Sequence, residues 1–213
     1  MTRGGPSVAV LDYGIGNLRS AQKALQRVGA DARLTADPTD IAAADGVVLP
    51  GVGAFGRCSQ ALEASGLTEV ARAAALDAGA GGRPFLGICV GLQLLFAASE
   101  ESPGSAGLGV LEGTVALLPE GVKRPQMQWN RLDHESGHAG HPMFAELGDE
   151  PWVYFVHSYS APVDGDTVAT CEYGGTLCAA VARGSLWATQ FHPEKSGDTG
   201  LAVLGNFVAA VAA

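Results

Sequence analysis

The stretch "FLGICVGLQLLF", residues 85–96, decides the fold class of this chain. Its first residues form a continuous apolar run, which is typical of a strand buried on both faces of a sheet. The run enters a glycine-containing turn and continues as "VGLQLLFAAS" (residues 90–99), which we predict to be a helix. Because a buried strand that leads into a helix is the unit of a parallel sheet covered by helices, this stretch predicts an α/β fold.

The first half of the chain repeats this unit. Apolar runs that end in turn residues are expected strands: residues 7–12, 46–50 and 84–88. Stretches with apolar residues at helical spacing lie between them: residues 17–29 and 67–79. The alternation predicts a mostly parallel central sheet flanked by helices on both faces.

The second half has a different pattern. Short apolar runs follow one another closely between turn residues: "VALLP", "WVYFVHSYS", "TVATCEY", "LCAAVARGS" and "LWATQF". Such spacing favours an added region of antiparallel strands. The polar segment "LDHESGHAGHPMF" (132–144) is expected to be exposed, and residues 200–213 to form a closing helix. Since no linker or repeat divides the chain, we expect residues 1–213 to form a single domain.

The composition limits the classes of partner. The 213 residues carry 22 acidic and 13 basic side chains, and the net charge of −9 opposes binding to nucleic acid or anionic lipid. An apolar fraction of 47% is typical of a folded globular chain. No apolar run has the length of a signal-peptide core or a membrane-spanning helix, so we expect a cytoplasmic protein that binds neither nucleic acid nor membrane.

Cys89 stands at the centre of a G-x-C-x-G pattern with Gly87 and Gly91. Between a strand and a helix, this pattern is the thiol counterpart of the nucleophile elbow. The glycines permit a sharp turn with Cys89 exposed at its tip, where the start of the helix favours the thiolate and the Val90 N–H points toward an oxyanion. The alternative is a buried cysteine that merely precedes a helix, but the flanking glycines favour the nucleophile.

His192 is the best candidate for the base that a thiolate nucleophile needs. In "ATQFHPEKSG" it ends an apolar run, and Glu194 follows two residues later. Side chains at i and i+2 of an extended chain point the same way, and Pro193 favours extended geometry before it, so Glu194 can orient the imidazole. The alternative is a strand end followed by a proline turn. His157 is expected to be a packed strand residue bonded to the backbone. The remaining histidines are expected to be solvated loop residues: His134, His138 and His141.

Glycine-containing turns follow two of the expected strands. The backbone N–H groups of "PGVG" (50–53) are free to line an oxyanion or hold a carboxylate. The stretch "VLDYGIGNLRS" (10–20) raises a dinucleotide-binding alternative, since Gly14 and Gly16 fit that fingerprint. The fingerprint needs a third glycine, but Arg19 occupies that position, so we expect a tight turn without a phosphate ligand.

A zinc site is the other alternative. The His192-x-Glu194 pattern also opens a zinc deaminase signature, which needs a later P-C-x-x-C, but no cysteine follows His192. Cys171 and Cys178 lack the spacing of zinc ligands. We therefore expect no metal and no cofactor, and Cys58, Cys171 and Cys178 are expected to be reduced core or surface thiols.

With Cys89, His192 and Glu194 in this order, the chain resembles the class I (triad) glutamine amidotransferases over nearly its whole length. Within them it is similar to the glutaminase subunits of imidazole glycerol phosphate synthases. The matching stretches are "LDYGIGNLRS", "LPGVG", "GICVGLQLLF", "QMQWN", "YFVHSYS" and "QFHPEKSG". The first of these, the "WN" pair and "HPEKSG" point to this subunit rather than to the anthranilate synthase or pyridoxal phosphate synthase glutaminases. The resemblance implies a flavodoxin-like fold.

The resemblance also implies roles for individual residues. Cys89 would attack the side-chain amide of glutamine, His192 would shuttle the proton, and Glu194 would orient His192. The N–H groups of Val52 and Val90 would form the oxyanion hole, with the "PGVG" loop reorienting before Val52 donates. The positions that hold glutamine would be Gly51, Gln93, Ser158 and Tyr159. Ammonia would then pass to a (β/α)8 cyclase partner, with which the chain would form a heterodimer.

In the family that partner makes imidazole glycerol phosphate and aminoimidazole carboxamide ribotide in histidine biosynthesis. Positions near its interface correspond to Asn17, Met127, Trp129, Tyr154 and Lys195. One departure is Gln128, which replaces the glycine usual before the Trp-Asn pair and puts coupling to the partner in question. Three other readings stay open: a glutaminase subunit of another class I amidotransferase, a free-standing cysteine amidohydrolase, and a noncatalytic binding module.

Overall fold

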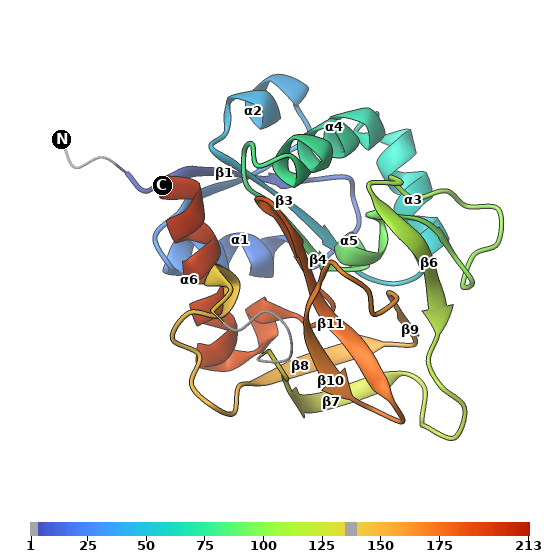
Figure 1. Ribbon diagram of the computed structural model, residues 1–213. Helices are drawn as coiled ribbons and strands as arrows, with labels where there is room; N and C mark the ends of the chain where they lie inside the picture. Colours follow the sequence, from blue (N-terminus) through green and yellow to red (C-terminus); the bar gives the residue numbers. More distant parts are fainter. Residues whose placement is uncertain (1–3, 135–139) are drawn as a thin grey trace.

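The computed structural model describes residues 4–134 and 140–213 (Figure 1). Its centre is a seven-stranded sheet in the order β10-β11-β12-β4-β3-β1-β2. The parallel strands are β1 (Ser7–Leu11), β2 (Asp31–Thr35), β3 (Gly46–Gly51), β4 (Phe85–Cys89) and β12 (Leu186–Thr189). The antiparallel strands at one edge are β10 (Thr167–Glu172) and β11 (Thr176–Arg183). The order β2-β1-β3-β4-β12 is the flavodoxin-like one, which confirms the predicted α/β class.

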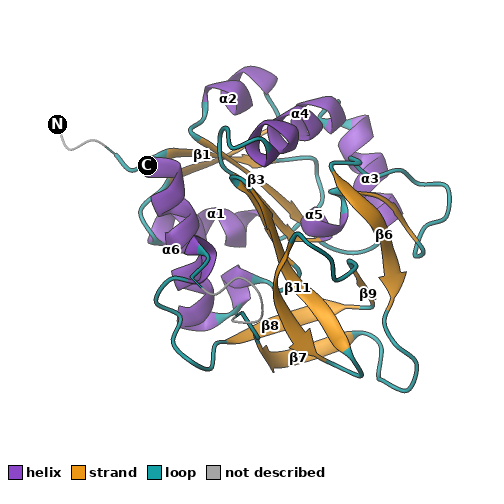
Figure 2. Cartoon of the chain, in the orientation of Figure 1, coloured by secondary structure: helices purple, strands orange, loops and turns teal. Residues whose placement is uncertain are grey.

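Helices cover both faces of this sheet (Figure 2). They are α1 (Leu18–Arg27), α2 (Pro38–Ala43), α3 (Phe55–Ala64), α4 (Thr68–Gly79), the single turn α5 (Val90–Gln93) and α6 (Gly197–Ala212). Helices α1 and α6 lie side by side on one face, and α3 and α4 lie on the other (Figure 1). Helix α4 buries a row of alanines at helical spacing, and such small side chains let a helix approach the sheet closely.

Two smaller sheets lie beside the central one. One contains β5 (Phe96–Ser99), β6 (Leu111–Leu117) and β9 (Tyr159–Ser160). The other is the antiparallel pair of β7 (Gln126–Arg131) and β8 (Trp152–His157), whose register runs from Gln126 opposite His157 to Arg131 opposite Trp152. The predicted antiparallel region is therefore present, divided between the edge of the central sheet and these added sheets.

The prediction of one helix over residues 90–99 was wrong. Helix α5 ends at Gln93, and the chain continues as strand β5. The carbonyl of Leu94 accepts from the N–H of Leu108 at 2.7 Å, and that of Leu95 accepts from Val110 at 2.8 Å. Because residues 90–96 are all buried, the run shows no polar face that would reveal its period, and pairing with residues later in the chain decided its conformation.

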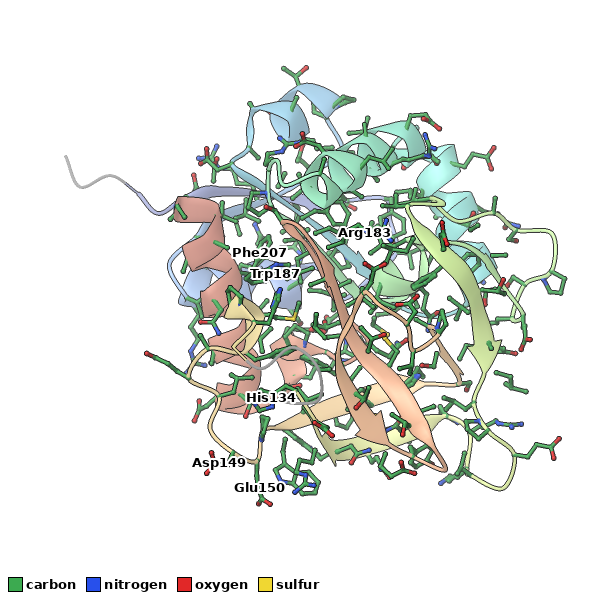
Figure 3. All side chains as sticks on the ribbon, viewed as in Figure 1. His134, Asp149, Glu150, Arg183, Trp187 and Phe207 are labelled. Carbon is green, nitrogen blue, oxygen red and sulfur yellow. The ribbon has the colours of Figure 1, made fainter. Side chains whose placement is uncertain are left out.

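The segment 132–144 is also less exposed than expected. Residues 135–139, which include His138, lie outside the described residues. After them, Met143 and Phe144 are buried, and the ring of His141 packs edge-on against Trp187 with ring centroids 5.4 Å apart. Trp187 packs in turn against Phe207 of α6 (Figure 3). His141 is therefore part of a packed aromatic contact and not a solvated loop residue.

No helix in the described part of the chain is both long and apolar enough to span a bilayer. All four cysteines are free, and all four are buried.

Candidate active site

Strand β4 ends at Cys89, and helix α5 begins at the next residue. Cys89 has φ 55° and ψ −109°, a strained conformation for a residue with a side chain. The glycines on either side are required for packing: a Cβ at Gly91 would lie 1.9 Å from the carbonyl oxygen of Leu49, and one at Gly87 would lie 2.9 Å from that of Gly91. The elbow is therefore present, and the strain is carried by the cysteine itself.

A pocket opens over this elbow. Its lining residues are Val52, Gly53, Cys89, Val90, Gln93, Glu101, Val156, His157, Ser158, Tyr159, His192 and Lys195. Cys89 and His192 are each only 3% exposed, so the prediction that Cys89 stands exposed at a tip was wrong. Its sulfur is instead enclosed in the wall of a pocket. Within residues 4–134 and 140–213, no group of three or more His, Cys, Asp or Glu side chains is placed to hold a metal ion.

His192 and Glu194 form a buried pair. The Nδ1 of His192 lies 2.8 Å from Oε1 of Glu194, and the two side chains are 4% and 2% exposed. His192 is extended, as expected, but Pro193–Lys195 form a 3₁₀ turn, so the turn and not an extended chain brings Glu194 back to the imidazole. The backbone N–H of His192 donates to the carbonyl of Tyr154 at 3.0 Å, which fixes the start of the turn.

The surroundings of His192 favour its charged form. Burial lowers the pKa of His192, but hydrogen bonds to the Cys89 and Glu194 side chains outweigh burial and raise that pKa to about 10. The interactions of the ring with the sulfur and with the carboxylate both favour the imidazolium. This arrangement suits a thiolate nucleophile with an adjacent proton donor.

Replacing Glu194 with glutamine is expected to lower the pKa of His192 by roughly 1 to 3, because a neutral amide stabilises the imidazolium less than a carboxylate. NMR titration of the His192 ring measures this directly. Because the folded pKa is raised, the pair stabilises the fold fully below about pH 6.5, and this contribution falls as the pH rises toward 10. The wild type should lose stability over that range, and the Glu194→Gln variant should lose less.

The matched control is Asp198→Asn, which removes an exposed carboxylate from the first turn of α6. It should leave the titration of His192 unchanged. An equal change in both variants would show that the net charge of the protein, and not the Glu194 carboxylate at 2.8 Å, sets the pKa of His192.

Two buried side chains hold the loop that carries Val52. The hydroxyl of Tyr13 donates to the carbonyl of Pro50 at 2.6 Å, and the Cys58 thiol donates to that of Val52 at 3.2 Å. Burial raises the pKa of Tyr13 and that of Cys58, so both remain protonated donors. No sequence pattern predicts these two contacts, because each of them depends on how the chain folds around the loop. The N–H groups of Val52 and Val90 belong to residues that line the pocket, as an oxyanion site requires.

Of the four positions expected to hold glutamine, Gln93, Ser158 and Tyr159 line the pocket. Gly51 instead lies against the elbow, where a Cβ would come within 2.8 Å of the Gly91 nitrogen. Glycine is therefore required at position 51 because the backbone of the elbow approaches it closely, and not because the position faces the pocket.

His157 also borders the pocket, but its ring is engaged by the protein. Its Nδ1 lies 2.8 Å from the carbonyl oxygen of Tyr159, and its Nε2 lies 2.9 Å from Oε1 of Gln126. Burial lowers the pKa of His157 to about 4, so the ring is neutral at neutral pH. The expectation of a packed histidine bonded to the backbone is confirmed.

Three of the five expected partner-facing residues, Asn17, Tyr154 and Lys195, contact the catalytic candidates or line the pocket. The Nδ2 of Asn17 lies 3.5 Å from Oε1 of Glu194. Lys195 lines the pocket, and the rings of Trp129 and Tyr154 lie with centroids 6.0 Å apart. Asn17 precedes α1 and Lys195 ends the 3₁₀ turn, whereas Trp129 and Tyr154 lie on the paired strands β7 and β8.

Strand β8 joins this region to the catalytic candidates. The backbone N–H of Tyr154 donates to Oγ of Ser196 at 2.9 Å, and that hydroxyl donates to the carbonyl of His192 at 2.6 Å. Two residues along the strand, the carbonyl of Val156 lies 3.9 Å from the sulfur of Cys89. A shift of β8 would therefore reach both His192 and Cys89.

The fifth residue, Met127, lies on β7 two residues before Trp129. It is 59% exposed, and Trp129 on the same face of the strand is 47% exposed. Gln128 between them is exposed and pairs with Phe155 in the regular register of the hairpin. The side chain at this position thus leaves the strand pairing intact.

Comparison with known proteins agrees with this geometry. Residues 9–211 match the family model "Glutamine amidotransferase class-I". The chain is 49% identical over 213 residues to the imidazole glycerol phosphate synthase subunit HisH of Synechococcus elongatus, covering 98% of this chain and 95% of that protein. It is 47% identical over 202 residues to the subunit HisH of Methanothermobacter thermautotrophicus, with coverages of 94% and 97%.

A crystal structure described as a glutamine amidotransferase superposes with a TM-score of 0.72 over 96% of this chain and 98% of the other. At 22% identity this likeness concerns the fold. The family match and the near full-length relatives together show that the chain belongs to the class-I glutamine amidotransferases, and within them to the HisH subunits of imidazole glycerol phosphate synthase.

Proposed function

We propose that residues 1–213 form one glutamine amidotransferase domain that hydrolyses glutamine to glutamate and ammonia. The observation that carries this proposal is the buried His192–Glu194 pair in a pocket that Cys89 and His192 both line. Cys89 is the nucleophile, His192 the proton shuttle, and Glu194 the group that orients and charges His192. No step requires a metal or cofactor.

In the first half of the reaction, the Cys89 thiolate attacks the side-chain amide carbon of glutamine. The carbonyl oxygen becomes an oxyanion, which the N–H groups of Val52 and Val90 stabilise. The His192 imidazolium gives its proton to the amide nitrogen, the C–N bond breaks, and ammonia leaves. A glutamyl thioester remains on Cys89.

In the second half, water attacks the thioester carbon and gives a proton to His192. The C–S bond then breaks, which releases glutamic acid and restores the thiolate–imidazolium pair. A pKa of about 10 for His192 in the resting state means that the proton donor is already in place when glutamine binds. Gln93, Ser158 and Tyr159 lie where they can hold the rest of the substrate, with Gly51 behind the elbow.

The second part of the proposal concerns a partner. The relatives' name, a subunit of imidazole glycerol phosphate synthase, supports a (β/α)8 cyclase subunit that receives the ammonia in a heterodimer. That enzyme would make imidazole glycerol phosphate and aminoimidazole carboxamide ribotide in histidine biosynthesis. Exposed apolar side chains on β7 supply a surface for it, and Asn17, Tyr154 and Lys195 connect that surface to the catalytic pair.

The test is glutamine hydrolysis by the chain alone and by the chain with the cyclase subunit and its nucleotide substrate. We expect low activity alone and strong stimulation in the complex. High activity of the lone chain with no response to the cyclase would instead support a free-standing amidohydrolase.

Replacing Trp129 with alanine is expected to weaken binding of the cyclase subunit about 30-fold or more, since an exposed tryptophan at the centre of an interface contributes about 2 kcal/mol or more. Titration calorimetry measures the dissociation constant. The control is Leu76→Ala, which removes a side chain of comparable exposure, 43% against 47%, from α4. Helix α4 lies at the opposite end of the molecule from β7 in Figure 1. Equal losses in the two variants would contradict the assignment of the β7 surface.

A further inference from the structure

Gln190 is a fully buried polar side chain next to the nucleophile. It follows β12 and stands two residues before His192, with 0% of its surface exposed. Its Nε2 lies 3.7 Å from the sulfur of Cys89, within hydrogen-bond distance for a sulfur acceptor. Its backbone N–H donates to the carbonyl of Ala179 at 2.8 Å, which fixes the residue against β11.

The orientation of the Gln190 amide follows from its neighbours. The carbonyl of Tyr159 can only accept, so the atom of Gln93 that faces it at 2.9 Å is the nitrogen. The same nitrogen lies 3.0 Å from Gln190 and must therefore face the Gln190 oxygen. The other amide atom of Gln190, which faces Cys89, is then its nitrogen. A backbone carbonyl thus aligns two amides in series and directs an N–H at the sulfur.

We propose that Gln190 is a positioning residue that donates a hydrogen bond to the Cys89 thiolate. This rests on the proposed role of Cys89 as the nucleophile. Cys89 is only 3% exposed, so few water molecules can reach a negative charge on its sulfur, and the protein must supply donors. His192 supplies one of them, but it gives up its proton during the reaction. An amide does not titrate, so Gln190 remains a donor at every stage of the reaction, including the thioester stage at which His192 is neutral.

The variant Gln190→Met tests this assignment, because it keeps much of the volume and removes the donor. The control is Gln126→Met. Gln126 is also 0% exposed, and its Nε2 lies 3.9 Å from a cysteine sulfur, that of Cys171. Each variant removes one buried amide and its contact with a pocket-lining side chain, Gln93 for Gln190 and His157 for Gln126, but only the first removes a donor to Cys89.

The first measurement is the rate at which iodoacetamide alkylates Cys89 at pH 7, followed by mass spectrometry of the Cys89 peptide. It uses the chain alone and needs neither glutamine nor the cyclase, so it is independent of the proposed function. Gln190→Met is expected to slow alkylation at least about 10-fold, the effect of losing a hydrogen bond to a charged group. Gln126→Met should match the wild type. A wild-type rate in Gln190→Met, or equal slowing in both variants, would overturn the proposal.

The second measurement is glutamine hydrolysis by the complex. Gln190→Met should lower kcat at least about 10-fold, because the lost hydrogen bond acts on the sulfur. KM should change less than kcat, since Gln93 loses its contact with Gln190 but keeps its bond to the carbonyl of Tyr159. A rise in KM with unchanged kcat would contradict the proposal. Absence of hydrolysis in the wild-type complex would instead contradict the proposed function. The alkylation rates would still decide whether Gln190 acts on Cys89.

A third measurement covers the case in which Gln190→Met does not fold. In a ¹⁵N-labelled chain, the Nε2 proton resonances of Gln190 and Gln126 are compared between the wild type and Cys89→Ala. Loss of the sulfur acceptor should move the Gln190 resonance and leave that of Gln126 in place. An unmoved Gln190 resonance would show that no hydrogen bond reaches Cys89.

Discussion

Cys89→Ala is expected to abolish glutamine hydrolysis by the complex, with kcat falling by roughly 10⁴-fold or more, as for the loss of other catalytic nucleophiles. The sulfur is the atom that forms the thioester, and neither the oxyanion N–H groups nor His192 can replace it. Synthesis by the cyclase from added ammonia should continue, because that reaction bypasses the thiol. A coupled assay with glutamine or an ammonium salt as nitrogen source measures both activities on one preparation.

The control for this prediction is Cys178→Ala, which removes another free and fully buried thiol, from strand β11. Burial raises the pKa of Cys178 to about 12, so this thiol stays protonated and inert. Hydrolysis should persist in that variant once its folding is verified. Appreciable glutaminase activity in Cys89→Ala, or a loss of ammonia-dependent synthesis, would contradict the assignment of Cys89 as the nucleophile.

Gly91→Ala is expected to prevent the native fold from forming, with a loss of more than about 4 kcal/mol of stability. A methyl group at this position would stand 1.9 Å from the carbonyl oxygen of Leu49 in β3. Both atoms belong to backbone that is held in place, since β3 and β4 are paired strands in the middle of the sheet. Relief would therefore require the elbow to move away from the strand. Circular dichroism and denaturant titration measure the loss.

The matched control is Gly205→Ala in helix α6, where a Cβ would meet nothing within 4 Å. Alanine is the better helix former, so this variant should be as stable as the wild type or up to about 1 kcal/mol more stable. If Gly91→Ala unfolded within about 1 kcal/mol of the wild type, the elbow would be far more tolerant than its packing indicates.

The local sequence was sufficient to predict the structure where a short pattern fixes the backbone conformation by itself. The G-x-C-x-G pattern after an apolar run predicted a strand, a turn and Cys89 at the turn, and the structure has each of them. The alternating strands and helices of the first half predicted the parallel sheet for the same reason. His192 and Glu194 were paired correctly, although through a turn rather than through an extended chain.

Local sequence failed where contacts distant in the chain decide the outcome. Phe96 follows α5 in an apolar run that fits a helix or a strand equally well, and it became a strand because residues near Leu108 pair with it. His141 belongs to a polar segment, yet packing against Trp187 covers it. No periodic pattern in the sequence indicates that Trp187 would pack against His141 or that Leu108 would pair with the segment after α5.

The sequence by itself determined the α/β class and the elbow, and it supplied the side chains that we propose to react, because spacing along one strand or turn fixes where those groups point. Only the tertiary structure decided how they are enclosed. It buried Cys89 instead of exposing it, put Tyr13 and Cys58 behind the "PGVG" loop, and directed the Gln190 amide at the sulfur. These contacts arise where separate strands meet at one end of the sheet. Their geometry depends on how the strands pack against one another, which no short pattern encodes.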